Sequence, residues 1–310
     1  MAEAYIKIRN TDGTEFTEDK LLSFRFRKDA YLPYTSLTGK VLSDEKIFAN
    51  AAEIFLYING VSVHHGLIDQ LTAETSSGIC TTSFASRGFT SLLCQNQIEP
   101  GMKTGVSLNS LMDSFYVFPY VTHENNTDAS NYIYVNKNSS MWDGVVNLSY
   151  KLCGKYPYIR GENCVRITPF PQPSSFSYTG QQLLSTGSAI TGKRLVSHFH
   201  MADIQQQYGT YELADNDVIA QKIIRHKFFD LDMEFLSDPD EALVFRDKYT
   251  CRGWKRLFCK YSGYNGEDLS DQITFSGVTA ERIAGVEVTG SSSGIITELS
   301  VYHDKFPREV

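Results

Sequence analysis

The sequence predicts a mainly β protein in which two small antiparallel β-barrels are joined by an α+β unit. Three observations predict this class: short runs of alternating apolar and polar residues, tight-turn signals between them, and 18 Tyr and 19 Phe beside only 2 Trp. Alternation with a period of two is typical of half-buried strands, in which aromatic residues are enriched. At 310 residues the chain is about twice the usual domain size, so several packed units are expected.

Residues 1–95 are predicted to form the first β-barrel. Phe24 and Phe26 alternate with polar neighbours, which is the pattern of a strand with one buried face. A later apolar run ends at Asn59-Gly60, and a second apolar run follows this dipeptide. Both central positions of a type I′ turn need positive φ, which Asn and Gly tolerate best, so a tight hairpin turn is expected here.

Residues 96–180 are predicted to form the α+β unit. Ser107 is a candidate N-cap for one helix, and Ser139 or Ser140 for a second, because a Ser side chain accepts a hydrogen bond from the first helical N–H groups. Residues 171–192 carry no charge and are rich in Pro, Ser, Gln and Gly. This segment is interpreted as a linker or an irregular connection.

Residues 181–310 are predicted to form the second barrel, interrupted by a helix at about 239–262. Asp238-Pro239 is a typical helix start, because proline fits the first helical turn. Four basic residues then recur at every fourth position and would form one stripe: Lys248, Arg252, Arg256 and Lys260. One interpretation of the stripe is the solvated back of an amphipathic helix. The functional interpretation is a contact to an acidic partner subunit or to a nucleic-acid backbone in a channel.

Composition excludes several classes of protein. A net charge of −7 argues against a basic surface that follows duplex DNA. The six cysteines, at positions 80, 94, 153, 164, 251 and 259, include no C-x-x-C pair, which favours free thiols in a reducing cytoplasm over a zinc or redox site. No apolar run is long enough to span a membrane, and no signal-peptide pattern opens the chain.

Residues that could carry chemistry are few. His198 and His200 share one strand face, a spacing that some metal sites use, but no third ligand is evident nearby. The acid pairs at positions 230 and 232 and at 240 and 241 are interpreted as capping or solvated residues, rather than as the facing carboxylates of a glycosidase. We therefore predict no catalytic residue, no metal site and no cofactor.

One stretch carries a more specific pattern. An apolar strand from Phe55 leads into the Asn-Gly turn, the return strand ends Gly-Leu-Ile-Asp at Asp69, and the run from Cys80 to Gly88 precedes a short helix. This stretch, within residues 50–95, resembles the first barrel of contractile-tail baseplate hub proteins, the group related to the phage Mu and T4-type hubs and to late control protein D. Gly88 stands where an acid is usual in that family. The order of the three units also resembles the family, as does the C-terminal hairpin that ends with Glu298 to Asp304.

The resemblance implies a structural protein without chemistry of its own. Hub proteins of this family form homotrimeric rings, in which two similar barrels per chain give a pseudo-six-fold collar between a six-fold tail tube and a three-fold spike. The implied partners are therefore two further copies of the chain, a tube protein and a spike protein, with DNA or a tape-measure protein as candidates for the lumen. The implied location is the baseplate of a phage or of a phage-tail-like particle such as a bacteriocin, assembled in the bacterial cytoplasm.

A ring would also cover weakly charged strand edges. Three segments are expected to form such edges: Tyr5 to Ile8, Phe55 to Ile58 and Gly285 to Thr289. Barrel one of one chain would pack against barrel two of the next. Two alternatives remain open: a receptor- or carbohydrate-binding tail module, which exposed aromatic platforms would favour, and a tail-associated hydrolase, which two carboxylates about 5–9 Å apart in a cleft would favour.

Overall fold

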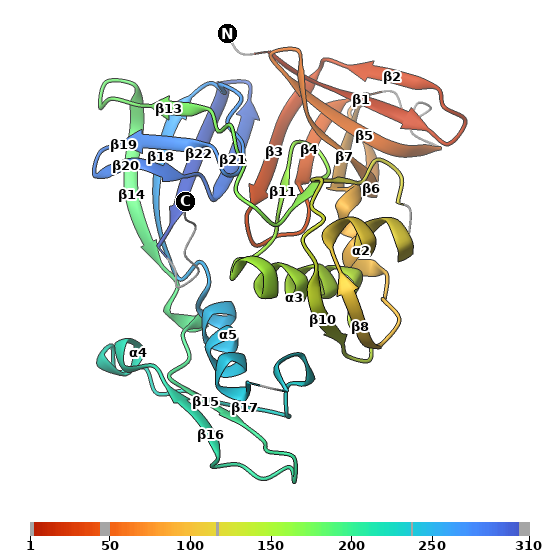
Figure 1. Ribbon diagram of the computed structural model, residues 1–310. Coiled ribbons are helices and arrows are strands. Elements are labelled where there is room, and N and C mark those ends of the chain that lie inside the picture. Colours follow the sequence, from red (N-terminus) through yellow and green to blue (C-terminus); the bar gives the residue numbers. More distant parts are fainter. Residues whose placement is uncertain (1–2, 44–49, 116–117, 237, 304–310) are drawn as a thin grey trace.

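A computed structural model of the chain describes residues 3–43, 50–115, 118–236 and 238–303. The first unit supplies seven strands and one short helix (Figure 1). They are β1 (Ala4–Asn10), β2 (Glu15–Glu18), β3 (Leu21–Asp29), β4 (Ser36–Leu42), β5 (Ala51–Ile58), β6 (Val61–Ser76), β7 (Ile79–Gly88) and α1 (Leu92–Gln95). On β3, Phe24 and Phe26 are buried while Arg25 and Arg27 are exposed, as the alternation predicts.

The middle unit is built from two helices and several short strands. They are β8 (Gly101–Val106), α2 (Leu108–Phe115), β9 (Thr122–His123), β10 (Ser130–Val135), α3 (Met141–Cys153), β11 (Tyr158–Arg160) and β12 (Cys164–Arg166). The predicted caps are confirmed: Ser107 Oγ accepts a hydrogen bond from Ser110 N at 3.2 Å, and Ser140 forms a capping box with Asp143. Helix α3 ends at Gly154, whose φ of 63° is the left-handed conformation that glycine tolerates.

From residue 175 onward, the described residues form ten strands and two α-helices. They are β13 (Ser175–Ser177), β14 (Leu183–Ile190), β15 (His198–Met201), β16 (Tyr211–Ala214), α4 (Asn216–Ala220), β17 (His226–Phe229), α5 (Pro239–Cys251), β18 (Lys255–Ser262), β19 (Gln272–Phe275), β20 (Val278–Arg282), β21 (Gly285–Ser291) and β22 (Gly294–Tyr302). Strands β21 and β22 form the predicted C-terminal hairpin. Asp304, at its expected end, lies outside the described residues.

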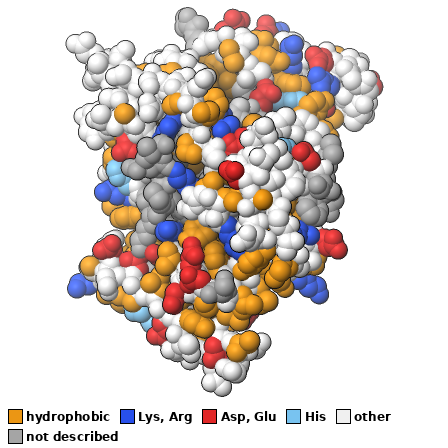
Figure 2. Space-filling model, in the orientation of Figure 1, with side chains coloured by type: hydrophobic (Ala, Val, Ile, Leu, Met, Phe, Trp, Pro, Cys, Tyr) orange, Lys and Arg blue, Asp and Glu red, His pale blue; other side chains and the backbone are white. Residues whose placement is uncertain are grey.

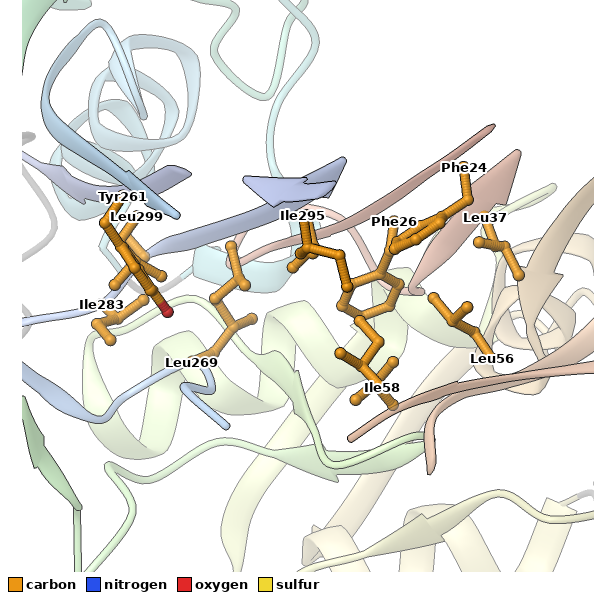
Figure 3. Packing of buried hydrophobic residues seen from close by; sticks show 14 of the residues in the cluster. Phe24, Phe26, Leu37, Leu56, Ile58, Tyr261, Leu269, Ile283, Ile295 and Leu299 are labelled. Atoms are coloured by element: carbon orange, nitrogen blue, oxygen red, sulfur yellow. The ribbon is translucent and has the colours of Figure 1, made fainter. Parts of the chain in front are cut away.

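One antiparallel sheet of 11 strands runs through both barrels, in the order β14-β18-β22-β21-β3-β4-β7-β6-β5-β1-β2. The expected mainly β class is thus confirmed. The barrels join where β21 pairs with β3, from Gly285 opposite Asp29 to Ser291 opposite Ser23. Their buried side chains form one continuous cluster, which Figure 3 shows running from Tyr261 and Leu299 at one end to Leu56 at the other.

Four smaller sheets cover or extend this frame. Strands β8 and β10 pair in the middle unit, as do β11, β12 and β9, while β13, β19 and β20 form a separate sheet. The three-stranded sheet β16-β15-β17 lies apart from the large sheet, next to α4 and α5, at the bottom of Figure 1. None of the described helices is long and apolar enough to cross a membrane.

Two predictions about the last unit are wrong. Residues 171–192 are not a linker, because they contain β13 and β14, and β14 pairs with β18 through backbone hydrogen bonds that need no particular side chain. The helix predicted over about 239–262 ends at Cys251. Arg252 leaves the helical region with a ψ of 137°, and Gly253 has a φ of 63°, so the chain turns and continues as β18.

Candidate assembly surfaces

Buried ion pairs and hydrogen bonds connect the three units. Lys28 of β3 is 6% exposed, and its Nζ lies 2.5 Å from Asp268 Oδ1 and 2.5 Å from the carbonyl oxygen of Gly161. Arg160 of the middle unit donates to Asp271, which is 1% exposed, at 2.9 Å. A buried charge that loses its partner costs several kcal/mol, so these pairs hold the units in one arrangement.

A second set of contacts lies where the two barrels meet. Asp29, at the end of β3, accepts a hydrogen bond from the hydroxyl of Tyr302 on β22 at 2.6 Å. Arg27 pairs with the same carboxylate at 2.8 Å. The Tyr302 ring stacks on Tyr31, with centroids 5.6 Å apart. Together with the β3–β21 pairing, these contacts make the angle between the barrels a fixed property of the chain.

The expected edge strands are not edges. The segments from Tyr5 to Ile8, from Phe55 to Ile58 and from Gly285 to Thr289 lie in β1, β5 and β21, each of which is paired on both sides. These segments carry few charges because they lie inside the sheet. In the 11-stranded sheet, the described strand edges that lack a second neighbouring strand are β2, β14 and residues 70–76 of β6, where β6 extends beyond β5 and has β7 as its neighbour.

Two of these edges carry few charges, whereas β2 has Glu15 and Glu18 among its four residues. β14 has none, and two of its apolar side chains are exposed: Leu184 at 60% and Ile190 at 63%. Residues 70–76 of β6 have Glu74 as their single charged residue. An uncharged and exposed strand edge is a template for pairing with another chain.

The four basic residues do not form one helical stripe, because the helix ends before two of them. Lys248 lies in the last turns of α5 and Arg252 follows the helix, whereas Arg256 and Lys260 share one face of β18. There both cations pair with Glu298 of β22, Arg256 at 2.6 Å and Lys260 at 3.0 Å. Arg256 and Lys260 thus share the one carboxylate of Glu298 within the chain.

The same sheet face carries further matched charges. Arg25 pairs with Glu287 at 2.8 Å, and Arg87 binds Asp69 with two hydrogen bonds of 2.7 Å. Acidic and basic side chains are also interspersed on the side of the molecule that Figure 2 shows. The polar face of the large sheet therefore carries interspersed positive and negative side chains that pair with one another, rather than side chains of one sign.

The stretch that resembles hub proteins forms one compact unit. Asn59 and Gly60 have φ values of 51° and 77°, so the predicted hairpin turn between β5 and β6 is confirmed. Asp69, which ends the Gly-Leu-Ile-Asp run, is the partner of Arg87 on the next strand. Gly88 follows Arg87, and a Cβ there would lie 2.7 Å from Thr35 Oγ1 and 2.9 Å from Asn163 Oδ1. No larger side chain fits, which explains why an acid is absent at this position.

The histidines of β15 have a neighbour that the sequence pattern did not reveal. His226 of β17 stacks on His198 with centroids 4.2 Å apart, and its Nδ1 lies 2.9 Å from Nε2 of His200. His200 also binds Glu212 at 2.9 Å. The neighbour was missed because β15 and β17 pair across a distance of 28 residues in sequence. Face-to-face stacking of His198 on His226 is a packing contact and does not direct the nitrogens of both rings at one ion.

Three of the four residues in the acid pairs have positions that account for them structurally, and Asp230 is exposed. Asp232 is buried, accepts a hydrogen bond from the backbone N–H of Glu234 at 3.0 Å, and pairs with Arg246 at 2.6 Å. Asp240 and Glu241 lie in the first turn of α5, where negative charge is favourable.

One further group of potential metal ligands lies together, and no local sequence pattern indicates it. Among the described residues this group is Asp215, Asp247 and Cys251, all buried. Asp215 caps α4, and the Cys251 thiol donates to Asp247 at 3.4 Å. These bonds give each residue a structural role.

Comparison with known proteins identifies the fold. The sequence matches no protein-family model and no curated protein. The structure is similar to the tail protein from Neisseria meningitidis MC58, with a TM-score of 0.69 and 13% identity over 98% of each chain. It is also similar to the 43 kDa tail protein of prophage MuSo2 from Shewanella oneidensis, with a TM-score of 0.71 and 12% identity over 98% of each chain.

A third similar structure comes from a secretion system. It is an E. coli component of the type VI secretion system that is described as similar to the T4 phage tail proteins gp27 and gp5. The aligned region covers 98% of this chain and 79% of the E. coli protein, with a TM-score of 0.56 and 7% identity. At such identities the likeness establishes the fold, and the resemblance to tail hub proteins is confirmed at that level.

Proposed function

We propose that this chain is the structural hub in the baseplate of a contractile phage tail or phage-tail-like particle. The observation that carries the proposal is the architecture: two barrels share one sheet, in a whole-chain fold also found in phage tail proteins. The units proposed from the sequence are 1–95, 96–180 and 181–310. A non-enzymatic role agrees with the pairing of Asp232 to Arg246, which leaves that acid unavailable as one of two facing catalytic carboxylates.

The hub would act as a homotrimeric ring. Eight consecutive strands run from β14 to β6, so three copies would close a barrel of 24 strands. Its two open edges have similar lengths, eight residues in β14 and residues 70–76 of β6. Pairing β14 of one copy with β6 of the next would satisfy both edges by a head-to-tail contact, which closes when each step rotates by 120°.

The polar face of this sheet would then line the lumen. Arg256 and Lys260 lie on it with Glu298, whereas Lys248 and Arg252 lie beyond it on and after α5. Because positive and negative side chains are interspersed on this face, the lumen would have no strong electrostatic field. DNA or a tape-measure protein could therefore pass without being held. Six quasi-equivalent barrels would face a six-fold tube protein on one side, and three-fold symmetry would match a spike protein on the other.

Electron microscopy of assembled particles tests the ring by counting copies, and three per baseplate are expected. Replacing Leu184 and Ile190 by Lys places two charges on the β14 edge and should prevent ring closure while leaving the chain folded, because both side chains are exposed. The matched control replaces Ile204 and Ile224, 79% and 60% exposed and outside β14 and β6, by Lys and should assemble normally. One or six copies per baseplate, or normal rings from the β14 variant, would refute the proposal.

A further inference from the structure

A strongly basic groove lies just beyond the end of β14, and Lys193 and Arg194 are the first of its lining residues in the sequence. It has a volume of about 720 Å³ and is bounded by β17, the C-terminal end of α5 and the turn Gly192–Arg194. Six of its lining residues are cationic: Lys193, Arg194, Arg225, Lys227, Arg246 and Arg252. None of its lining residues is Asp or Glu, although the chain as a whole has a net charge of −7.

Three of the arginines are held in place by the protein. Arg225 donates to the carbonyl oxygens of Gly192 and Leu195 at 2.8 and 3.0 Å. Arg246 pairs with Asp232, and Arg252 stacks over the Tyr249 ring at 3.8 Å from its centroid. A guanidinium that is fixed in this way keeps N–H groups for a ligand and loses little side-chain entropy when the ligand binds.

The other three cations are exposed and lack a counterion. Lys193, Arg194 and Lys227 form no ion pair with any residue in the described part of the chain. Like charges gathered in one hollow repel one another, and an anion in the groove would relieve this repulsion. The groove therefore favours a ligand with several negative charges.

We propose that the groove binds an acidic, partly apolar segment of a partner protein. Its wall includes Val196, Phe229 and Tyr249, which offer apolar surface between the charges, and carboxylates accept paired hydrogen bonds from arginine. This site goes beyond the proposed ring, because its residues belong neither to β14 nor to β6. The binding is a property of the single chain and does not require the trimer.

The neighbouring hollow favours a protein ligand over nucleic acid. Arg194 and Arg252 also line a second hollow of about 480 Å³, which continues onto the polar face of the large sheet. There Asp29, Glu287 and Glu298 lie among the cations. A phosphate backbone needs an unbroken basic track and would meet these carboxylates, whereas a short acidic segment can end in the first groove.

Fluorescence anisotropy with the purified chain tests the proposal. The probes are a labelled peptide of alternating Glu and Leu, a peptide of alternating Glu and Ser, and oligo-dT of equal charge. We expect the Glu-Leu peptide to bind most tightly and its affinity to fall with added salt. Replacing Lys193, Arg194 and Lys227 by Gln should weaken its binding about tenfold or more. Replacing the exposed Lys20, Lys137 and Lys222 by Gln makes the same change in net charge and should alter binding less than about twofold.

Each other outcome overturns the proposal. Tighter binding of oligo-dT would assign the groove to nucleic acid, and equal losses in the two variants would reduce the effect to net charge. No loss in the groove variant would place the peptide elsewhere. Circular dichroism checks that both variants are folded, and the single change Lys227→Glu replaces the triple variant if the latter is not.

Discussion

The seam between the barrels depends on a glycine that lies under an aromatic ring. Gly290 of β21 is opposite Phe24 of β3 in the strand register, and a Cβ at Gly290 would overlap the Phe24 ring. Phe24 is only 5% exposed and packs in the shared core, so it cannot turn away freely. Overpacking at such sites costs about 1–3 kcal/mol, and we expect Gly290→Ala to lower the free energy of unfolding by that amount.

Urea unfolding of single and double variants separates this clash from other effects. Phe24→Leu alone should cost about 1–2 kcal/mol through lost apolar burial. In that background Gly290→Ala should cost less than about 0.5 kcal/mol, which gives a coupling energy near 1 kcal/mol or more. Gly285→Ala on the same strand is the matched control, because its added Cβ would lie at an ordinary 3.4 Å from Ser300 Cβ. An equal cost for Gly290→Ala in both backgrounds would refute the reasoning.

Three further predictions concern the first barrel and the thiols. Gly60→Val should lower stability by about 1–2 kcal/mol, because a β-branched residue would have to adopt positive φ; unchanged thermal unfolding would contradict this. Burial lowers the pKa of His64 to about 3, so as pH falls below about 6.5 only the unfolded chain takes up this proton. The free energy of unfolding should then fall by up to about 1.4 kcal/mol per pH unit because of this group. When the free energy of unfolding is plotted against pH, the His64→Gln variant should show a shallower slope than the original chain between pH 6.5 and 5. Six thiols should titrate in the denatured, non-reduced chain, with buried Cys251 and Cys259 reacting only after unfolding; fewer than about five would indicate disulfides.

Features of the fold with local causes could be predicted from the sequence. The Asn59-Gly60 turn, the Ser140 capping box and the start of α5 at Pro239 each depend on a few adjacent residues. The end of α5 also has a local signal, since Gly253 follows Arg252, but the four-residue spacing of the cations favours a longer helix. On β18, Cys259 and Tyr261 are buried, which is the period of two that indicates a strand.

The surfaces that matter for assembly depend on pairing between distant segments. The composition of Tyr5 to Ile8 does not indicate whether β1 lies inside the sheet or at its edge. The position of β1 in the sheet depends on its pairing with β2 and β5. β14 has no charge and a weak apolar pattern, so its pairing with β18 was invisible in the sequence. The basic groove combines residues from 193 to 252 that lie on separate elements, and for the same reason no motif revealed it.

The continuity of the large sheet has a mechanical consequence. Barrels joined by a flexible linker would rotate against each other, and a ring made from them would have to fix that angle during assembly. Here seven residue pairs join β3 to β21, and the buried Lys28–Asp268 pair also joins the two barrels. The Arg160–Asp271 pair ties the middle unit to the second barrel, and the hydrogen bond from Lys28 to the carbonyl oxygen of Gly161 ties it to the first. Breaking any of these contacts exposes backbone groups or leaves a buried charge unpaired, so the chain is expected to move as one body. If the chain forms a ring, the angle between its two barrels is set at folding, and the contacts between copies alone determine whether the ring closes.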